Sequence, residues 1–251
     1  MIRIVHRGVA QLASAPALGA GGRRFESFHP DQSLFMNFIL DFDSTIVRVE
    51  SLDELARMVL AGDPDGEAKA AQIANITAAG MEGRIGFADS LRQRMALVSP
   101  RRNQVEALID SLHEAVDNSF VREADWLAKR SNAVWVVSGG FDDWIVPVVE
   151  RLGLRADHVL ANRLIWDTDG VARGYETGRP LAQDDGKVLA VRSLSLDGGV
   201  VMVGDGMTDY EVRRAGLADT FVAYVAHADR PAVRAVADEI ADNIDKIKKL
   251  C

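Results

Sequence analysis

Three short apolar runs divide the chain, at 37–42 (NFILDF), 133–138 (AVWVVS) and 200–205 (VVMVGD). Each run is rich in β-branched or aromatic residues and ends in small or acidic ones, which is typical of buried parallel strands. Amphipathic helical patterns separate the runs, so the sequence predicts an α/β fold with a doubly wound parallel sheet. Ligands of such sheets bind beyond the carboxyl ends of the strands, where the polar ends of these runs are expected to meet.

The longest gap between runs, over 51–130, contains no convincing strand. It holds amphipathic stretches such as EAKAAQIANITAAG, FADSLRQRMALV and QVEALIDSLHEAV. Roughly eighty helical residues between consecutive strands is far more than a crossover helix needs. We therefore expect residues 51–115 to form a small helical cap domain inserted into an α/β core made of 36–50 and 116–251.

Two local signals refine this outline. Ser51 and Glu54 form a capping-box pattern, which predicts that a helix begins at Ser51. Asp169 and Gly170 stand at the centre of the stretch RLIWDTDGVARGYE, which predicts a β-hairpin over 163–176.

The composition, with 48% hydrophobic and 26% charged residues, is that of an ordinary soluble globular protein. The formal net charge of −8 at pH 7 argues against nucleic acid or an anionic membrane as partner, since both bind clustered Lys and Arg. No apolar run approaches the roughly 20 residues that span a bilayer. The single cysteine, Cys251, excludes an internal disulfide and fits a reducing compartment, so a cytoplasmic location is expected.

Residues 1–35 differ from the rest of the chain because they are rich in Arg and poor in acids. One interpretation is an organellar transit peptide, which would make the location organellar. The other is an extended gene start, with Met36 as the working initiator. On either interpretation this N-terminal extension stands outside the predicted fold.

The first apolar run ends in two carboxylates, Asp41 and Asp43. Side chains two positions apart on an extended backbone point to the same side, so these two acids repel each other. A solvated strand end with a turn is the ordinary explanation. A calcium loop is excluded, because Ile46 and Leu52 stand where such a loop needs Gly and Glu.

Three more groups stand at comparable positions. Ser138, Gly139 and the next glycine follow the second run and open a helix, where backbone N–H groups can approach an anion. Lys187 opens the helical run KVLAVRSLSL, and Asp205 and Asp209 follow the third run. Each group has an ordinary explanation when it is considered alone. The glycines can form a plain tight turn, Lys187 can be a solvated surface charge, and Asp205 and Asp209 can belong to an acidic loop.

Taken together, the acids, the glycine turn and the lysine are expected to converge on one edge of the sheet. Unpaired carboxylates gathered there would be strongly unfavourable unless a hard divalent cation that takes oxygen ligands offsets their charge. Mg²⁺ fits that description best. A magnesium ion beside a helix N-terminus and a lysine predicts a site for a phosphoryl group.

The order D-x-D-x-T, Ser-Gly-Gly, Lys and G-D-G-x-x-D resembles the haloacid dehalogenase superfamily of phosphotransferases. The segments DFDSTIVRVESLDELA, GMEGRIGFADSLRQRM, VVSGGF, ANRLI and VGDGMTDYE are similar to its phosphoserine phosphatase subfamily, over about 36–250. The resemblance implies the Rossmann-like fold of that superfamily. It also implies Mg²⁺-dependent hydrolysis of O-phospho-L-serine, the last step of serine biosynthesis, through an aspartyl-phosphate. The partner would be a small phosphorylated amino acid, and the protein a monomer or homodimer.

The resemblance also implies roles for the catalytic and metal residues. Asp41 would be the nucleophile, and Asp43 the general acid and base. Mg²⁺ would be held by the Asp41 carboxylate, the Asp43 main-chain carbonyl and Asp205. Ser138, the Gly139 N–H and Lys187 would bind the phosphoryl oxygens. Thr45, Thr208 and Asp209 would support these residues without contacting the substrate.

By the same resemblance, Glu50 would meet the substrate ammonium and Arg94 its carboxylate, which a guanidinium can bind through two parallel hydrogen bonds. Met81 and Phe87 would shield the ligand from water. The ordinary alternatives are that Glu50 is a surface acid near a helix start and that Arg94 is a charge on a helix face.

One position departs from the subfamily pattern. By its spacing the usual lysine falls on Asp185, and Lys187 comes two residues late. We expect the loop AQDDGK to shift its register so that Lys187 reaches the phosphate. Three other functions stay open: a related phosphatase for another small phosphomonoester, a phosphotransferase with homoserine as acceptor, and a non-catalytic receiver-like module phosphorylated on Asp.

Overall fold

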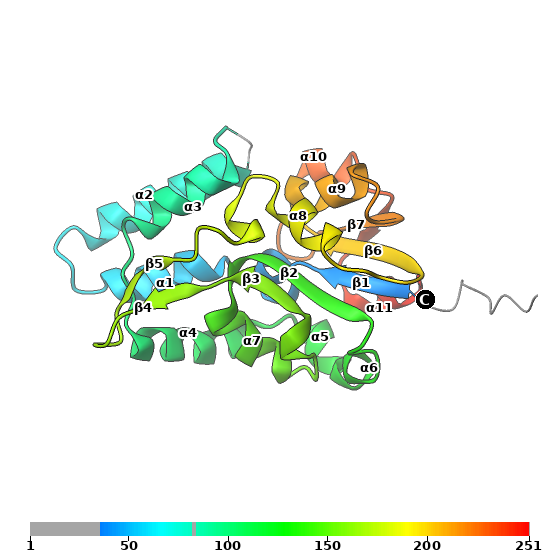
Figure 1. Cartoon of the computed structure of the whole chain (residues 1–251), viewed down its shortest axis with the longest axis horizontal. Coiled ribbons are helices and arrows are strands. Elements are labelled where there is room, and N and C mark those ends of the chain that lie inside the picture. Colours follow the sequence, from blue (N-terminus) through cyan, green and yellow to red (C-terminus); the bar gives the residue numbers. More distant parts are fainter. Residues whose placement is uncertain (1–35, 82–83, 251) are drawn as a thin grey trace, which may run out of the picture. The chain divides into compact units, whose positions relative to one another are not determined.

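A six-stranded parallel sheet lies at the centre of the described chain (Figure 1). The computed structural model describes residues 36–81 and 84–250, so the predicted extension over 1–35 lies outside these residues. The strands follow the order β3 (Val159–Asn162), β2 (Val134–Phe141), β1 (Met36–Leu40), β6 (Gly199–Gly204), β7 (Thr220–Tyr224) and β8 (Glu239–Ala241). The three apolar runs form β1, β2 and β6, which confirms the predicted α/β fold.

The register brings the carboxyl ends of β1 and β6 level with each other, while β2 runs on past them to Phe141. Leu40 at the end of β1 is paired with Val136 in β2 and with Val203 in β6. From β1 the sheet continues through β2 and β3 on one side and through β6, β7 and β8 on the other. The strand order therefore reverses beside β1, and such a switch point is where α/β sheets bind their ligands.

Alternate side chains of β1 enter two separate hydrophobic layers. Phe38 and Leu40 belong to the larger layer and Ile39 to the smaller one, and all three are buried. A strand buried on both faces needs a continuous apolar run, which explains why NFIL does not alternate with polar residues. The larger layer is covered by α5 (Asn118–Arg122), α6 (Ala124–Lys129), α7 (Asp142–Glu150) and α11 (Ile244–Lys248), and the smaller by α8 (Gly186–Arg192), α9 (Met207–Arg214) and α10 (Pro231–Arg234).

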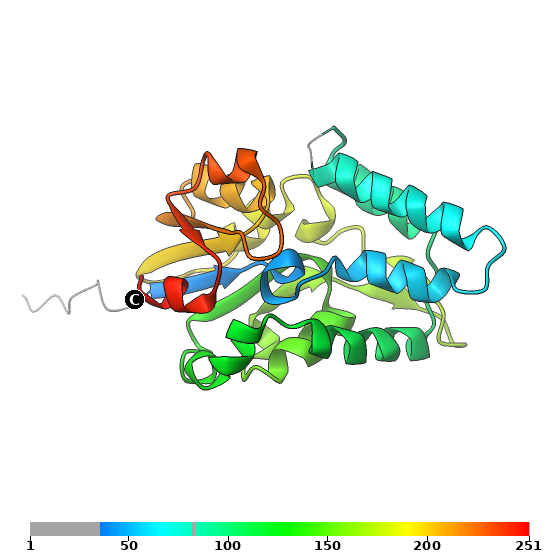
Figure 2. The same cartoon turned by 180° about the vertical axis from the view of Figure 1, so that it is seen from behind.

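The described residues of 51–115 form four helices and no strand, as predicted. They are α1 (Ser51–Leu60), α2 (Gly66–Met81), α3 (Phe87–Met95) and α4 (Arg102–Ala115). Both views show α2 and α3 side by side, and α4 running along α7 on the opposite side (Figures 1 and 2). An antiparallel bridge joins Val47 to Val116, where the chain leaves the sheet layer and returns to it. The division into a cap and a core at these residues stays a prediction.

The remaining elements are short. The predicted hairpin is present as β4 (Leu164–Trp166) and β5 (Ala172–Tyr175), with Gly170 in the left-handed region at φ +70°. Three further helical turns are η2 (Phe42–Ile46), η3 (Ala156–His158) and η4 (Pro180–Ala182). None of the helices in the described part of the chain has the length and apolar character needed to cross a lipid bilayer.

Candidate active site

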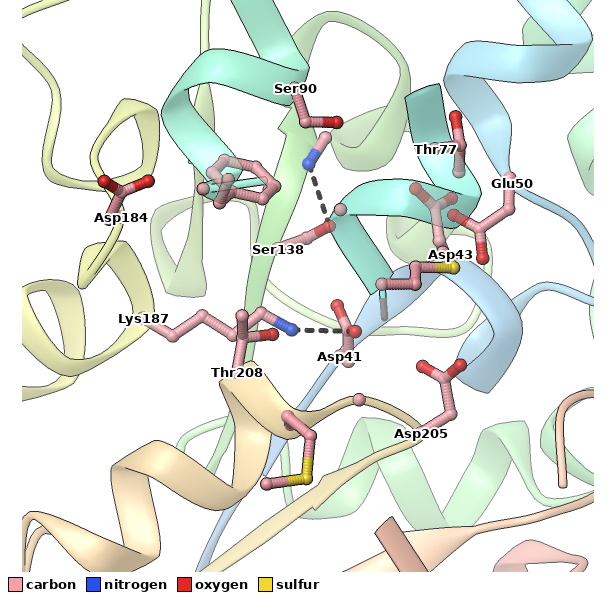
Figure 3. Close-up of a pocket in the computed structure, with 18 of the residues that line it drawn as sticks. Asp41, Asp43, Glu50, Thr77, Ser90, Ser138, Asp184, Lys187, Asp205 and Thr208 are labelled. Atoms are coloured by element: carbon pink, nitrogen blue, oxygen red, sulfur yellow. Dashed lines mark hydrogen bonds and ion pairs between the residues drawn. The ribbon is translucent and has the colours of Figure 1, made fainter. Parts of the chain in front are cut away.

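A cavity of about 460 Å³ lies at the carboxyl ends of the central strands, between the loops that follow them and the helices α2 and α3 (Figure 3). Nearly all of the residues that the sequence predicted for the site line it: Asp41, Asp43, Glu50, Met81, Phe87, Arg94, Ser138, Gly139, Lys187, Asp205 and Thr208. The two exceptions, Thr45 and Asp209, are fully buried and do not line the cavity.

Lys187 reaches the first strand end despite its late position in the sequence. Its Nζ lies 2.7 Å from Asp41 Oδ2 and 2.6 Å from Asp209 Oδ1 (Figure 3). Burial, the largest influence, lowers the pKa of Lys187, but the attraction of Asp209 and Asp41 exceeds it, so the pKa is raised. The ammonium is therefore charged and neutralises two buried carboxylates.

The backbone before α8 explains how Lys187 arrives. A Cβ atom on Gly186 would lie 2.8 Å from the carbonyl oxygen of Pro180, so only glycine lets the loop close onto η4. The helix α8 then begins at Gly186, and Lys187 projects from its first turn. This start of the helix places Lys187 where its ammonium reaches Asp41.

Asp43 turns away from the strand direction because the next residue adopts an unusual conformation. Ser44 has φ +53°, in the left-handed region that a non-glycine residue occupies at some cost, and its hydroxyl donates to Glu50 Oε1 at 2.8 Å. Asp43 then accepts from the backbone N–H and the hydroxyl of Ser51 at 3.0 and 3.1 Å. Trp144 Nε1 donates to the same hydroxyl at 2.9 Å and fixes it.

The helix α1 begins at Ser51 as predicted, but the predicted cap is wrong. The N-cap residue is Glu50, which makes no side-chain capping bond, and the Ser51 hydroxyl serves Asp43 instead. The pKa of Asp43 is raised well above its usual range, first by burial and then by the charges of Glu50 and Asp41. Both effects favour the protonated form of the Asp43 carboxyl.

Three carboxylates could hold a cation. One oxygen each of Asp41, Asp205 and Asp209 lie within 4.8 Å of one another. Asp209 is already engaged by Lys187 and by the Gly206 N–H at 3.0 Å. Burial raises the pKa of Asp209 although Lys187 opposes this effect. An all-oxygen donor set beside a lysine suits a hard divalent cation.

Arg230 is a cavity residue that sequence analysis missed. Its Nη1 donates to the Asp205 main-chain oxygen at 2.8 Å and forms an ion pair with the Asp205 carboxylate. Its Nη2 lies 3.0 Å from the Met81 sulfur on α2. Arg230 lies in a loop without a motif, and no sequence signal places it here.

The glycine turn after β2 is shaped by its neighbours. The Gly140 N–H donates to Ser138 Oγ at 3.1 Å (Figure 3), and a Cβ on Gly139 would lie 2.4 Å from the Phe87 ring. Asn162 is fully buried and donates to the Gly139 carbonyl at 2.9 Å and to the Leu181 carbonyl at 3.0 Å. Asn162, also missed as a site residue, therefore ties the glycine turn to the segment that leads to Lys187.

Arg94 and Glu50 also line the cavity. Arg94 is only 8% exposed, and its guanidinium makes two long contacts of 3.4 Å, to the Ser90 carbonyl and to the Thr77 hydroxyl. No carboxylate of the described chain lies within 4.0 Å of it. Burial lowers the pKa of Arg94, and burial raises the pKa of Glu50.

Comparison with known proteins gives consistent matches. The sequence profile of the haloacid dehalogenase-like hydrolase family matches residues 38–214. The chloroplastic phosphoserine phosphatase of Arabidopsis thaliana is 33% identical over 201 residues, covering 79% of this chain and 65% of that protein. The phosphoserine phosphatase of Mus musculus is 32% identical over 198 residues, covering 77% of this chain and 83% of that protein. The chain thus spans just under two thirds of the chloroplastic relative.

Solved structures agree with these matches. A phosphoserine phosphohydrolase-like protein from Francisella tularensis has a TM-score of 0.76 and 29% identity, covering 86% of this chain and 99% of that chain. A phospho-aspartyl intermediate analogue of phosphoserine phosphatase has a TM-score of 0.67 and 30% identity, covering 86% and 98%.

Proposed function

This chain belongs to the haloacid dehalogenase-like hydrolase family and groups with its phosphoserine phosphatases, and on that premise we propose that it hydrolyses O-phospho-L-serine to L-serine and phosphate. The reaction passes through an aspartyl-phosphate on Asp41. The observation that carries the proposal is a buried Arg94 that has no carboxylate of the described residues within 4.0 Å, in the same cavity as the ion pair of Asp41 and Lys187.

Asp41 is held ready to attack phosphorus. Its Oδ1 accepts from the Phe42 N–H at 2.7 Å, and its Oδ2 is paired with Lys187, so the carboxylate is held in one orientation. Lys187, the Ser138 hydroxyl and the Gly139 N–H would contact the phosphoryl oxygens. They would stabilise the charge that develops as the bond to the leaving oxygen breaks.

Asp43 supplies and removes the protons. Burial raises its pKa and so favours the protonated form, from which it would donate a proton to the departing serine oxygen. The carboxylate that results then accepts a proton from the water that attacks the aspartyl-phosphate. Ser51 and Trp144 keep this side chain in one orientation throughout.

The donor set fits Mg²⁺. The carboxylates of Asp41 and Asp205 and the main-chain carbonyl of Asp43 would hold the ion, and Asp209 would support it through Lys187. When bound, Mg²⁺ supplies positive charge that offsets the repulsion between the nucleophile and the phosphoryl oxygens.

The amino-acid part of the substrate would lie between Glu50 and Arg94. Arg94 would bind the substrate carboxylate through two parallel hydrogen bonds, and no carboxylate of residues 36–81 and 84–250 lies within 4.0 Å to compete for the guanidinium. Glu50 would accept from the substrate ammonium. Met81 and Phe87 would exclude water from this end of the cavity, which strengthens both ion pairs.

Steady-state turnover of a panel of small phosphomonoesters, with and without Mg²⁺, tests the proposal. Phosphoserine should have the highest kcat/KM. Arg94→Ala should lower that value by about 10²-fold or more, because a buried charged hydrogen bond is lost, and should change the turnover of phenyl phosphate much less. Arg92→Ala is the matched control, since Arg92 lies on the same helix, is exposed and pairs with Asp89. An equal loss on both substrates, or preference for another ester, would contradict the assignment.

A further inference from the structure

The helix α3 receives its N-terminal cap from a distant part of the chain. The residue before it, Gly86, has no side chain that could accept a hydrogen bond from the first turn. Asp184, in the loop between η4 and α8, fills this place, since its Oδ1 accepts from the Ala88 N–H at 2.9 Å. Figure 3 shows Asp184 directed towards the helix that carries Ser90. A carboxylate at this position satisfies a free N–H group and complements the helix dipole.

The fit between the two segments depends on glycine. A Cβ atom on Gly86 would lie 2.6 Å from Asp184 Oδ1, so any larger residue would displace the carboxylate. The Gly86 backbone itself, at φ −65° and ψ 153°, is open to every residue. Glycine is therefore needed at this position because Asp184 approaches closely, and not because of the backbone conformation.

Asp184 has no competing partner. In the part of the chain that the structure describes, its side chain makes no hydrogen bond or ion pair other than that to Ala88. The side chain lies on the surface at the edge of the cavity and lines it. Among the described residues, the hydrogen bond to the Ala88 N–H is thus the one interaction that orients the Asp184 side chain.

This contact joins the two halves of the site. The helix α3 carries Phe87, Ser90 and Arg94 to the cavity, and the loop that carries Asp184 leads after three residues to Lys187. The same short loop therefore reaches both the nucleophile and the helix that would bind the substrate carboxylate. A change in the docking of α3 moves Arg94 relative to Asp41.

We propose that Asp184 is a positioning residue that holds α3 closed over the cavity and so places Arg94 on the substrate. The role in substrate binding rests on the proposed function. The capping contact does not, and it can be measured in the free protein.

The test compares Asp184→Ala and Asp184→Asn, with Asp185→Asn as the matched control that removes a neighbouring charge. Asp184→Ala should speed amide hydrogen exchange at Ala88 and raise the KM for phosphoserine about five-fold, the usual effect of losing an N-cap, with kcat changed less than about two-fold. Asp184→Asn keeps an oxygen acceptor and should stay close to the wild type in both measurements. Exchange at Ala88 that is unchanged in Asp184→Ala would overturn the proposal, and so would faster exchange with an unchanged KM.

Gly86→Ala gives an independent perturbation, because it displaces the carboxylate without altering it. Alone it should reproduce the exchange and KM effects of Asp184→Ala. The double variant should show no further change, since both substitutions break one contact. Additive effects would contradict the proposal. If the wild type fails to hydrolyse phosphoserine, the proposed function falls, while the exchange measurements still decide whether Asp184 caps α3.

Discussion

Replacing Lys187 by methionine removes the charge at the centre of the site while keeping the length of the side chain. The ammonium lies 2.7 Å from Asp41 and 2.6 Å from Asp209, and all three groups are buried. With an effective dielectric constant of about 20, each pair attracts by about 6 kcal/mol. The net loss is smaller because the ammonium no longer has to be desolvated. Breaking a buried pair by removing one partner typically costs about 3–5 kcal/mol.

The loss should appear in two measurements. The free energy of unfolding from urea titration, in the absence of Mg²⁺, should fall by about 3–5 kcal/mol in Lys187→Met. The kcat for phosphoserine should fall by about 10²–10³-fold, the effect of removing one group that stabilises transition-state charge. Lys246→Met, which removes an exposed lysine paired with Asp242, should change neither quantity appreciably.

Either measurement can refute the reasoning. If Lys187→Met kept kcat within about three-fold of the wild type, the lysine would not act on the phosphoryl group. If the stability were the same as that of the Lys246→Met control, the buried ion pair with Asp41 and Asp209 would not form in solution.

Two further predictions concern the carboxylates of the site, and a third concerns the buried Asp117 outside it. Asp41→Asn should lower kcat by about 10⁴-fold or more with an unchanged circular dichroism spectrum, and near-normal turnover would exclude Asp41 as nucleophile. Asp43→Asn should lower kcat by about 10²–10⁴-fold, because both the proton donor to the serine oxygen and the base for the attacking water are lost, and near-normal turnover would count against both roles. Burial raises the pKa of Asp117, but hydrogen bonds from Ser119 and the nearby His227 lower it overall. A lowered pKa stabilises the fold above the unfolded pKa, and this contribution is lost as the pH falls through the folded value. Asp117→Asn should therefore reduce the free energy of unfolding by about 1 kcal/mol at pH 7, a difference that shrinks towards pH 3, whereas one that grew in acid would reverse the sign of the argument.

The sheet and the position of the site could be predicted because they depend on local signals. The runs that became β1, β2 and β6 are apolar on both faces, as strands covered by helices on both sides must be. Parallel strands place their carboxyl ends together, so Asp41, Ser138 and Asp205 could be assigned to one edge of the sheet from sequence alone.

The contacts made across the site could not be predicted in the same way. Ser51 has the pattern of a helix cap, yet its hydroxyl binds Asp43 because the left-handed Ser44 turns that carboxyl back towards it. Asp184 and Arg230 lie in loops with no periodicity, and the contacts of Asp184 with Ala88 and of Arg230 with Met81 join residues more than ninety positions apart. Such contacts arise from tertiary packing, which overrides local preference and leaves no pattern in the sequence.

The most direct test of the account is to look for the phosphorylated enzyme. Wild-type protein would be mixed with phosphoserine and Mg²⁺, quenched in acid during turnover and digested, and the peptides would be analysed by mass spectrometry. The account predicts one phosphoryl group on Asp41. This group should not form when Mg²⁺ is chelated before mixing, and it should be absent from Asp41→Asn. Phosphorylation of another residue, or turnover with no phosphorylated peptide at any quench time, would contradict it.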